Sequence, residues 1–199
     1  MRGKASLFAL AIVLLLATLG LPTAIMAGTR DVAAAVARLN GKVVMDGDRI
    51  MKVDLSSSSV TDADLEVLAG ATDLREVDLR LTEIGDEGMN YLKTLTALRF
   101  LNLFRTHVTD EGLRRLKGMT GLETLLIGGT RVTDASMITV RAFSNLKKLS
   151  VFDTRVDDAG IKELAGLTKL QTLLIGKSKV TEDGLAQLRR ALPNLSTMD

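Results

Sequence analysis

RFLNLFRTHVTDEGLRRLKGMTGL, residues 99–122, holds the pattern that decides the fold of this chain. Its first residues alternate along an extended strand, so Leu101 and Leu103 face one side while Phe100 and Phe104 face the other. The face that carries the same residue type in neighbouring segments is the one expected to form a core. We therefore compared this segment with the sequence on either side of it.

The same pattern recurs on both sides at a step of 24 residues. Self-similarity at a fixed step of this size is the signature of a solenoid, in which each unit stacks on the next. We number the units 1 to 6 and count positions from the first residue of each unit. The units are residues 51–74, 75–98, 99–122, 123–146, 147–170 and 171–195, the last being one residue longer.

Positions 3 and 5 are apolar in every unit, and so is position 10, which follows a turn. The strand pairs are Val53/Leu55, Val77/Leu79, Leu101/Leu103, Leu125/Ile127, Leu149/Val151 and Leu173/Ile175. Position 10 holds Val60, Ile84, Val108, Val132, Val156 and Val180. These residues predict one continuous core with a parallel strand from each unit. Phe100 and Phe104 then belong to the exposed face of the sheet.

The second half of each unit predicts a short helix. Thr109 is placed to cap the helix N-terminus, where Asp110 and Glu111 interact favourably with the helix dipole. Apolar residues follow at every third position, namely Leu113, Leu116, Met119 and Leu122. Helices need about 8–10 Å between axes and strands only about 4.8 Å, so the stack must curve with its strands inside. The predicted fold is an α/β solenoid, a short right-handed horseshoe with parallel strands on the concave face and short helices on the convex face.

Both ends of such a stack need caps, because the core would otherwise meet water. Residues 28–50 predict an N-terminal cap, with a helix over 31–40 and a hairpin that turns at Asp46–Gly47. Residues 196–199 predict a minimal C-terminal cap, with Met198 at position 3 of a seventh unit. The last strand would leave an open edge, through which copies of the chain could form a homo-oligomer.

The consensus LxxLxLxxTxVTDxGLxxLxxLxxL resembles the leucine-rich repeat family over residues 51–195. It is most similar to the "VTD" variety of secreted bacterial proteins, which is related to the cysteine-containing repeats. The resemblance implies the horseshoe fold and a protein-interaction role, commonly through the concave face. It does not identify the ligand, which differs between members of the family.

The first 27 residues are typical of a secretory signal. Arg2 and Lys4 precede an apolar run over 7–21, and small residues lead to an expected cleavage site near Ala27. The alternative is an uncleaved anchor, because residues 5–27 are long enough to span a bilayer. The chain is accordingly expected to be periplasmic or secreted, or else held in the membrane and facing outside.

Composition excludes several classes of function. The chain has no cysteine, which removes disulfides, thiolate nucleophiles and a lipid-attachment cysteine. Without residues 1–27 it carries 24 basic and 24 acidic side chains. This balance argues against binding nucleic acid or an anionic membrane through net charge.

The concave positions 2, 4 and 6 are charged in the first two units and carry large apolar residues from unit 3 onward. We predict that the central ligand contacts are Phe100, Phe104, Leu126, Phe152 and Leu174, with Arg105, Arg131 and Arg155 as a polar rim. Such a patch on a soluble protein usually marks an interaction site. The alternative is that Phe104 and Phe152 cover the bare backbone of Gly128 between them, as aromatic residues can cover strand glycines.

Position 9 forms a second row, which runs Ser59, Glu83, His107, Arg131, Arg155 and Lys179. Its cationic half could bind an acidic protein or a polysaccharide. A solvated flank whose cations pair with neighbouring acids is the simpler interpretation. The acids at position 12, Asp62, Asp86, Asp110, Asp134, Asp158 and Glu182, could suggest calcium, but helix N-termini explain them without a metal.

Little in the sequence favours catalysis. The single histidine, His107, falls in a turn where other units have Ser, Glu, Arg or Lys, and no nucleophile–base pair or metal triad can be assembled. The sequence therefore predicts an exported, non-catalytic protein-binding module without a cofactor. The alternative is a structural or self-associating envelope component, possible also in a membrane-anchored form.

Overall fold

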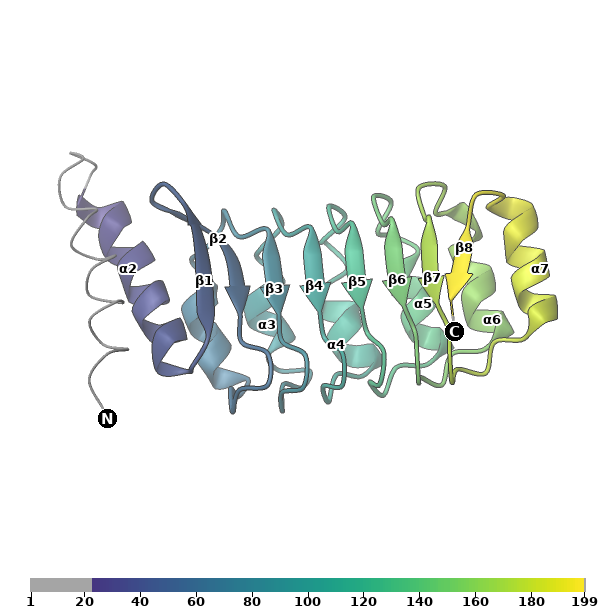
Figure 1. The fold of residues 1–199 in the computed structure, drawn as a ribbon, viewed down its shortest axis with the longest axis horizontal. Helices are drawn as coiled ribbons and strands as arrows, with labels where there is room; N and C mark the ends of the chain where they lie inside the picture. The colour runs from purple at the N-terminus through teal and green to yellow at the C-terminus, as the bar shows by residue number, and fades with distance from the viewer. Residues whose placement is uncertain (1–22, 199) are drawn as a thin grey trace.

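The computed structural model describes residues 23–198, which form one row of stacked units (Figure 1). A single sheet has the strand order β1-β2-β3-β4-β5-β6-β7-β8. The strands are β1 Lys42–Asp46, β2 Arg49–Asp54, β3 Glu76–Asp78, β4 Phe100–Asn102, β5 Thr124–Leu126, β6 Lys148–Ser150, β7 Thr172–Leu174 and β8 Ser196–Met198. The predicted signal falls mainly on residues 1–22, outside the described residues.

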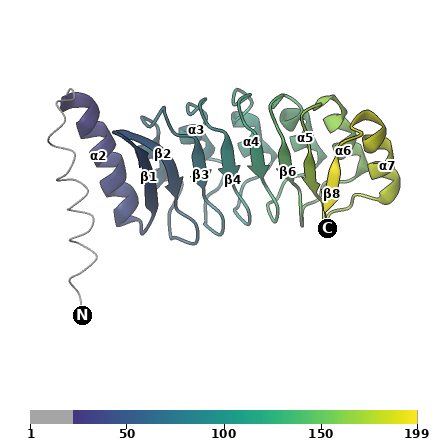
Figure 2. The same cartoon turned by 45° about the horizontal axis from the view of Figure 1, so that its top comes forward.

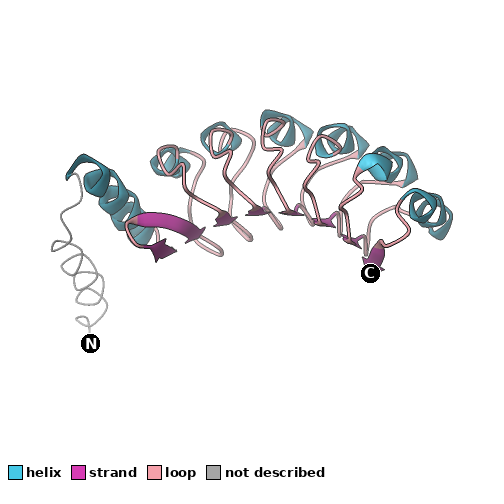
Figure 3. Cartoon of the chain, turned by 90° about the horizontal axis from the view of Figure 1, so that it is seen from above, coloured by secondary structure: helices cyan, strands magenta, loops and turns pink. Residues whose placement is uncertain are grey.

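Helices lie behind the sheet, one or two to a unit (Figure 2). They are α2 Thr23–Arg38, the 3-10 helix η2 Ala63–Leu68, α3 Met89–Leu92, α4 Asp110–Arg115, α5 Asp134–Val140, α6 Asp158–Lys162, the 3-10 helix η3 Glu163–Gly166 and α7 Glu182–Ala191. Seen from above, the helices form the outer arc and the strands the inner arc (Figure 3). The predicted α/β solenoid with a concave sheet is confirmed.

Strand register follows the sequence repeat. β2 to β8 are parallel, and each residue at position 3 pairs with the residue 24 places later, as Val77 does with Leu101. The predicted core residues at positions 3 and 5 are buried in all six units, and the most exposed is Ile175 at 6%. The helical stripe from Leu113 to Leu122 is buried too. Because each face of a strand is fixed by this register, the concave side chains are fixed with it.

Helix length depends on how well the N-terminus is capped. The hydroxyl of Thr109 accepts from the N–H of Glu111, as predicted, and α4 follows as an α-helix. Unit 2 has Gly85 at the same position and forms only the four-residue α3. In unit 1 the hydroxyl of Thr61 donates to Asp64 instead, and a 3-10 helix results. A missing cap leaves helix N–H groups without their side-chain acceptor.

The N-terminal cap differs from the expectation in two details. The helix α2 begins at Thr23, well before the predicted start, and ends at Arg38. The hairpin pairs Asp46 with Arg49, so its two-residue turn is Gly47–Asp48, one residue later than predicted. Gly47 has φ of +62°, which explains why glycine occupies this turn.

The C-terminal strand corrects the sequence register. The sequence places Met198 at position 3, but β8 pairs Thr197 with Leu173 and Met198 with Leu174. The step from β7 to β8 is again 24 residues, because α7 is longer than the helices of the other units while the link from Leu195 to β8 is one residue shorter. Met198 therefore faces the concave side, where 51% of it is exposed, and does not join the core.

Candidate functional site

The concave surface is made by the side chains at positions 2, 4 and 6 of the units. The five predicted contact residues all face this side and are all half-buried; they are Phe100, Phe104, Leu126, Phe152 and Leu174. None of them is among the strongly exposed hydrophobic residues of the described chain, whereas Met198 is. The five residues therefore do lie on the concave side, but contacts among them cover part of each side chain.

Phe104 and Phe152 form the aromatic centre of this surface. Their ring centroids lie 6.4 Å apart with an interplanar angle of 43°, which is a tilted aromatic pair. Gly128 lies between them, and a Cβ built on it would meet the carbonyl of Phe152 at 2.9 Å and the ring of Phe104 at 3.1 Å. The ring of Phe104 and the backbone and Cβ of Phe152 therefore do close over Gly128, which lies in the turn after β5. This packing leaves each ring half-buried, so the pair also remains available at the surface.

Two cations lie over these rings. The guanidinium carbon of Arg105 is 5.3 Å from the centroid of Phe104, and the ammonium of Lys177 is 5.6 Å from that of Phe152. Both distances are within the range of cation–π contacts. The predicted rim residue Arg105 thus touches the aromatic pair, and Lys177, which the sequence had not selected, has the equivalent role in unit 6.

Side chains at position 4 accept hydrogen bonds from the backbone N–H groups of the two phenylalanines. The side chain of Asn102 accepts the N–H of Phe104 at 3.0 Å, and Ser150 accepts that of Phe152 at 3.4 Å. Units 4 and 6 have leucine at position 4 and glycine at position 6 instead. Large and small residues therefore alternate along position 6. The small ones make room for the rings of their neighbours.

The N-terminal half of the concave surface is charged and internally paired. Lys52 is 3.2 Å from Glu76, and Arg80 is 3.6 Å from Asp78. Burial raises the pKa of Asp54, but hydrogen bonds from Ser56 and nearby cations outweigh it and hold the pKa below its usual value. Because the charges of this half pair with one another, it presents fewer unpaired charges to a ligand than the C-terminal half does.

Sequence reasoning missed two residues of the site. Met198 extends the position 4 row beyond Leu126 and Leu174, and only the strand register could have revealed this. Asn102 is 4% exposed and orients Phe104 through its carbonyl oxygen. A polar residue at position 4 is the signal for this role, since Asp54, Asp78 and Ser150 also accept the N–H two residues later.

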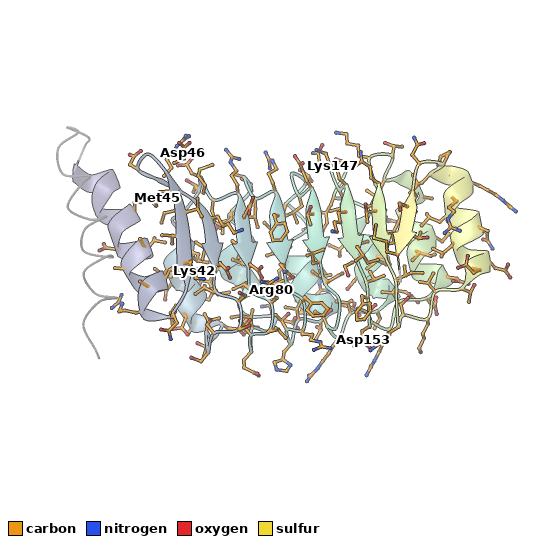
Figure 4. All side chains as sticks on the ribbon, viewed as in Figure 1. Lys42, Met45, Asp46, Arg80, Lys147 and Asp153 are labelled. Atoms are coloured by element: carbon orange, nitrogen blue, oxygen red, sulfur yellow. The ribbon has the colours of Figure 1, made fainter. Side chains whose placement is uncertain are left out.

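The flank of the sheet carries the remaining predicted rim residues. It lies along the edge where Figure 4 labels Asp153, opposite the edge that carries Lys147. Arg131 and Arg155 are exposed there at position 9. Neither forms an ion pair among the described residues, and no contact joins them to the phenylalanines. The expected pairing of the flank with acids occurs only for His107, whose Nε2 is 2.7 Å from Glu83.

The aspartates at position 12 join adjacent units, a role the sequence interpretation missed. Asp86 accepts from the N–H and the hydroxyl of Thr109 in the next unit at 2.8 and 2.7 Å. Asp110 does the same with Thr133, and the hydroxyl of Ser136 also donates to it. We call Asp62, Asp86, Asp110, Asp134 and Asp158 the inter-unit aspartates. Their position at helix N-termini is as predicted, but their hydrogen bonds hold the solenoid together.

Glycine at position 14 follows from this arrangement. A Cβ on Gly88, Gly112, Gly160 or Gly184 would collide with the aspartate of the preceding unit. In unit 4 the position is occupied by Ser136, whose hydroxyl donates to the aspartate. The "D-x-G" part of the repeat is thus a packing and hydrogen-bonding device.

The described residues offer little for catalysis. No group of three or more histidine, cysteine or acidic residues within 23–198 could hold a metal ion. A cavity of about 620 Å³ lies between α2, the β1–β2 hairpin and the segment after η2, lined in part by Val32, Ile50 and Val67. It lies at the N-terminal end of the solenoid, away from the aromatic pair. In the part of the chain that the structure describes, no helix is long and apolar enough to cross a membrane.

Comparison with known proteins agrees with the geometry. A leucine-rich repeat family model matches residues 70–93, 94–117 and 144–165. No curated protein matches the sequence significantly. The structure is similar to an internalin (inlF) of Listeria monocytogenes, with a TM-score of 0.55 and 17% identity over 85% of this chain and 54% of that one. It is also similar to an internalin C2 (inlC2) of the same organism, with a TM-score of 0.56 and 19% identity over 86% and 81%.

This chain spans about half the length of the first of these structures. At such identities the likeness concerns the fold alone. Together with the parallel sheet, the repeat register and the matched units, it leads to one conclusion: the chain folds as an α/β solenoid of leucine-rich repeats, similar in fold to the Listeria internalins.

Proposed function

We propose that this protein is an exported, non-catalytic module that binds another protein through its concave surface. Phe100, Phe104, Leu126, Phe152 and Leu174 would be the central contacts, with Arg105, Arg131 and Arg155 at the rim. Leucine-rich repeat solenoids usually serve as binding domains, which supports the general role. The signal-like residues 1–27 support export.

The observation that carries the proposal is the half-buried aromatic pair. Phe104 and Phe152 lie on a surface whose other half is charged and paired, and cations flank both rings. Aromatic and arginine side chains are the residues that most often carry the binding energy of protein interfaces. Met198, with 51% of its surface exposed, continues the apolar row toward the end of the sheet.

The test is partner capture from the envelope and secreted fractions of the source organism, using the purified protein and a Phe104→Asp/Phe152→Asp variant. The matched control is Ala135→Asp/Ile138→Asp on the convex helix α5, where both residues are exposed. This control adds the same negative charge away from the concave surface. Circular dichroism and thermal unfolding must show that each variant is folded.

A partner bound by wild type and by the control, but lost by the concave variant, is the expected result. Equal recovery by all three proteins would contradict the proposal and leave the phenylalanines as packing over Gly128. A Phe104→Leu/Phe152→Leu variant serves if the aspartate variant does not fold. It keeps the apolar cover but removes the rings, and it should weaken binding measurably.

A second candidate is self-association, which one observation favours. β8 is the edge strand of the described sheet and has only β7 as a neighbour. Edge strands are templates for pairing with another chain. Analytical ultracentrifugation would show a mass that rises with protein concentration if this edge joins copies, and Met198→Lys would reduce that rise. A constant monomer mass would exclude this candidate.

A further inference from the structure

Position 9 of the units forms a second backbone ladder beside the main sheet. The N–H at this position donates to the carbonyl at position 10 of the preceding unit, at 3.1, 3.3 and 3.0 Å for Arg131, Arg155 and Lys179. Backbones joined in this way lie about one strand spacing, about 4.8 Å, apart. We call these three residues the cationic row. They occupy the same position in consecutive units, although the residue paired with Lys179 in the backbone register is Asp157, two places after Arg155.

No acid relieves the repulsion within this row. All three side chains are exposed, and none forms an ion pair within residues 23–198. Elsewhere the solenoid places opposite charges at equivalent positions of adjacent units, as in Lys52–Glu76 at 3.2 Å and Glu123–Lys147 at 2.6 Å. Like charges at equivalent positions of adjacent units repel each other, since the units lie about one strand spacing apart. The cationic row therefore lowers the stability of the free protein, and a bound anionic ligand would remove this repulsion.

The surroundings of the row are also mainly cationic. Arg105 and Lys177 lie at position 7 of the same flank and form no ion pair in the described chain. Two acids are nearby: Asp153 is exposed, and Asp157 accepts the N–H of Ala159 at 2.8 Å as the cap of α6. Neither is within ion-pair distance of the row.

Charge is distributed unevenly along the whole molecule. Residues 28–98 contain 13 acidic and 8 basic side chains, whereas residues 99–199 contain 11 acidic and 16 basic ones. An anionic chain is therefore repelled by one half of the solenoid and attracted to the half that carries the row. This asymmetry is hidden in the nearly neutral total.

From these observations we propose that the cationic row binds an acidic polysaccharide, with one carboxylate or sulfate of successive sugars against each cation. One sugar ring advances a chain by roughly the distance between two strands, so its charges can follow the row. Acidic side chains on one face of an extended peptide recur every second residue, about 6.6 Å apart, and fit this register less well. The site lies on the flank of the sheet and shares Arg131 and Arg155 with the rim of the proposed protein-binding surface, but it includes none of the phenylalanines.

The test measures binding of polygalacturonate, dextran sulfate and neutral dextran by isothermal titration calorimetry. The variant is Arg131→Glu/Arg155→Glu/Lys179→Glu. The control, Lys117→Glu/Lys162→Glu/Arg190→Glu, makes the same change in net charge at exposed residues on the helical side. We expect wild type and control to bind at least one anionic polymer within about twofold of each other, and the row variant at least about tenfold more weakly. The two polymers distinguish carboxylate from sulfate.

Absence of binding to both anionic polymers, or equal loss in the control, would overturn the proposal. So would equally tight binding of a poly-glutamate peptide, which would assign the row to an acidic protein. A second measurement needs no ligand: Arg155→Glu places an acid between two cations and should raise the melting temperature of the free protein by about 1–3 °C. An unchanged or lower melting temperature would show that the row carries no unrelieved repulsion.

Discussion

At the scale of single residues, the inter-unit aspartates are the clearest link between sequence and stability. One carboxylate at position 12 satisfies donors of the next unit, and glycine at position 14 leaves space for it. Glu182 in unit 6 has the same sequence position but a different role. It is 3.6 Å from Arg189, and 86% of its side chain is exposed. The acidic residue at position 12 is therefore expected to contribute much more to stability in the units with an inter-unit aspartate than in unit 6.

Asp110→Ala should lower the free energy of unfolding by about 2–3 kcal/mol. The change leaves the N–H of Thr133 and the hydroxyls of Thr133 and Ser136 without their acceptor, and several are partly buried. Glu182→Ala is the matched control and should change stability by less than about 0.5 kcal/mol. Urea unfolding of both variants measures the difference. Equal effects would contradict the inter-unit role.

The same aspartate predicts how stability depends on pH. Burial raises the pKa of Asp110, but hydrogen bonds from Ser136 and Thr133 outweigh it, so its pKa in the folded protein is below its usual value. Thr181 occupies the same repeat position as Thr133, and its hydrogen bonds lower the pKa of Asp158 in the same way. A lowered folded pKa contributes stability that is present above the unfolded value of about 3.9 and is lost as the pH falls through the folded value.

We therefore expect the stability difference between wild type and Asp110→Asn to be constant from about pH 7 to pH 5 and to shrink below about pH 4. Urea unfolding at a series of pH values measures it. A difference that persists undiminished in acid would mean that the ionised form of Asp110 is not the stabilising one.

At the scale of elements, the sequence predicted the strands better than the helices. Period-two alternation fixed which residues of each strand are buried, and Leu101 and Leu103 are in the core as expected. Helix extent depends on caps that a shared consensus hides: Thr109 caps α4, whereas Thr61 bonds Asp64 and caps nothing. The register of Met198 was wrong because the longer α7 is followed by a shorter link, so the position of Leu195 does not show where β8 begins.

The candidate site was predictable only in outline. Alternation placed Phe104 and Phe152 on the concave side, but whether they touch each other depends on side-chain rotamers. Their cover over Gly128 and the cations above them are contacts between residues 24 or more places apart, or between neighbours at a turn. The repeat pattern offered the cover of Gly128 as one of two interpretations, but it did not reveal which cations lie over the rings. The unpaired state of Arg131 and Arg155 likewise needed the positions of the acids.

Gly85→Thr should stabilise the protein by about 1 kcal/mol. Threonine at this position supplies the cap that α3 lacks and a hydroxyl for Asp62, as Thr109 does for Asp86. A Cβ on Gly85 would meet only Asp62, at 3.4 Å, which is ordinary contact. Replacing glycine also restricts the unfolded chain. Thermal and urea unfolding measure the gain, and Gly85→Ala, which adds no hydroxyl, should recover less of it.

At the scale of the whole molecule, the stability of a solenoid depends on the interface between each unit and the next, because each unit contacts only its neighbours. We call each of these interfaces a joint. The joints between units 2 and 3, 3 and 4, and 5 and 6 carry both an N–H and a hydroxyl on the inter-unit aspartate. The joint between units 1 and 2 has only the N–H of Gly85, and that between units 4 and 5 has only the N–H of Asp157. Joint strength therefore varies along an otherwise regular stack.

The joint between units 1 and 2 lacks the hydroxyl hydrogen bond and lies close to one end of the solenoid, so it should open before the others. Native-state hydrogen exchange measures this directly: the amide of Leu55 bonds across that joint, and the amide of Leu103 bonds across the joint between units 3 and 4. We expect the opening free energy at Leu55 to be lower by about 1–2 kcal/mol, the worth of one hydrogen bond and one cap. In Gly85→Thr the two values should converge, because the added hydroxyl repairs that joint alone. Equal protection in wild type would mean that the solenoid unfolds as a single unit and that its joints do not set its stability.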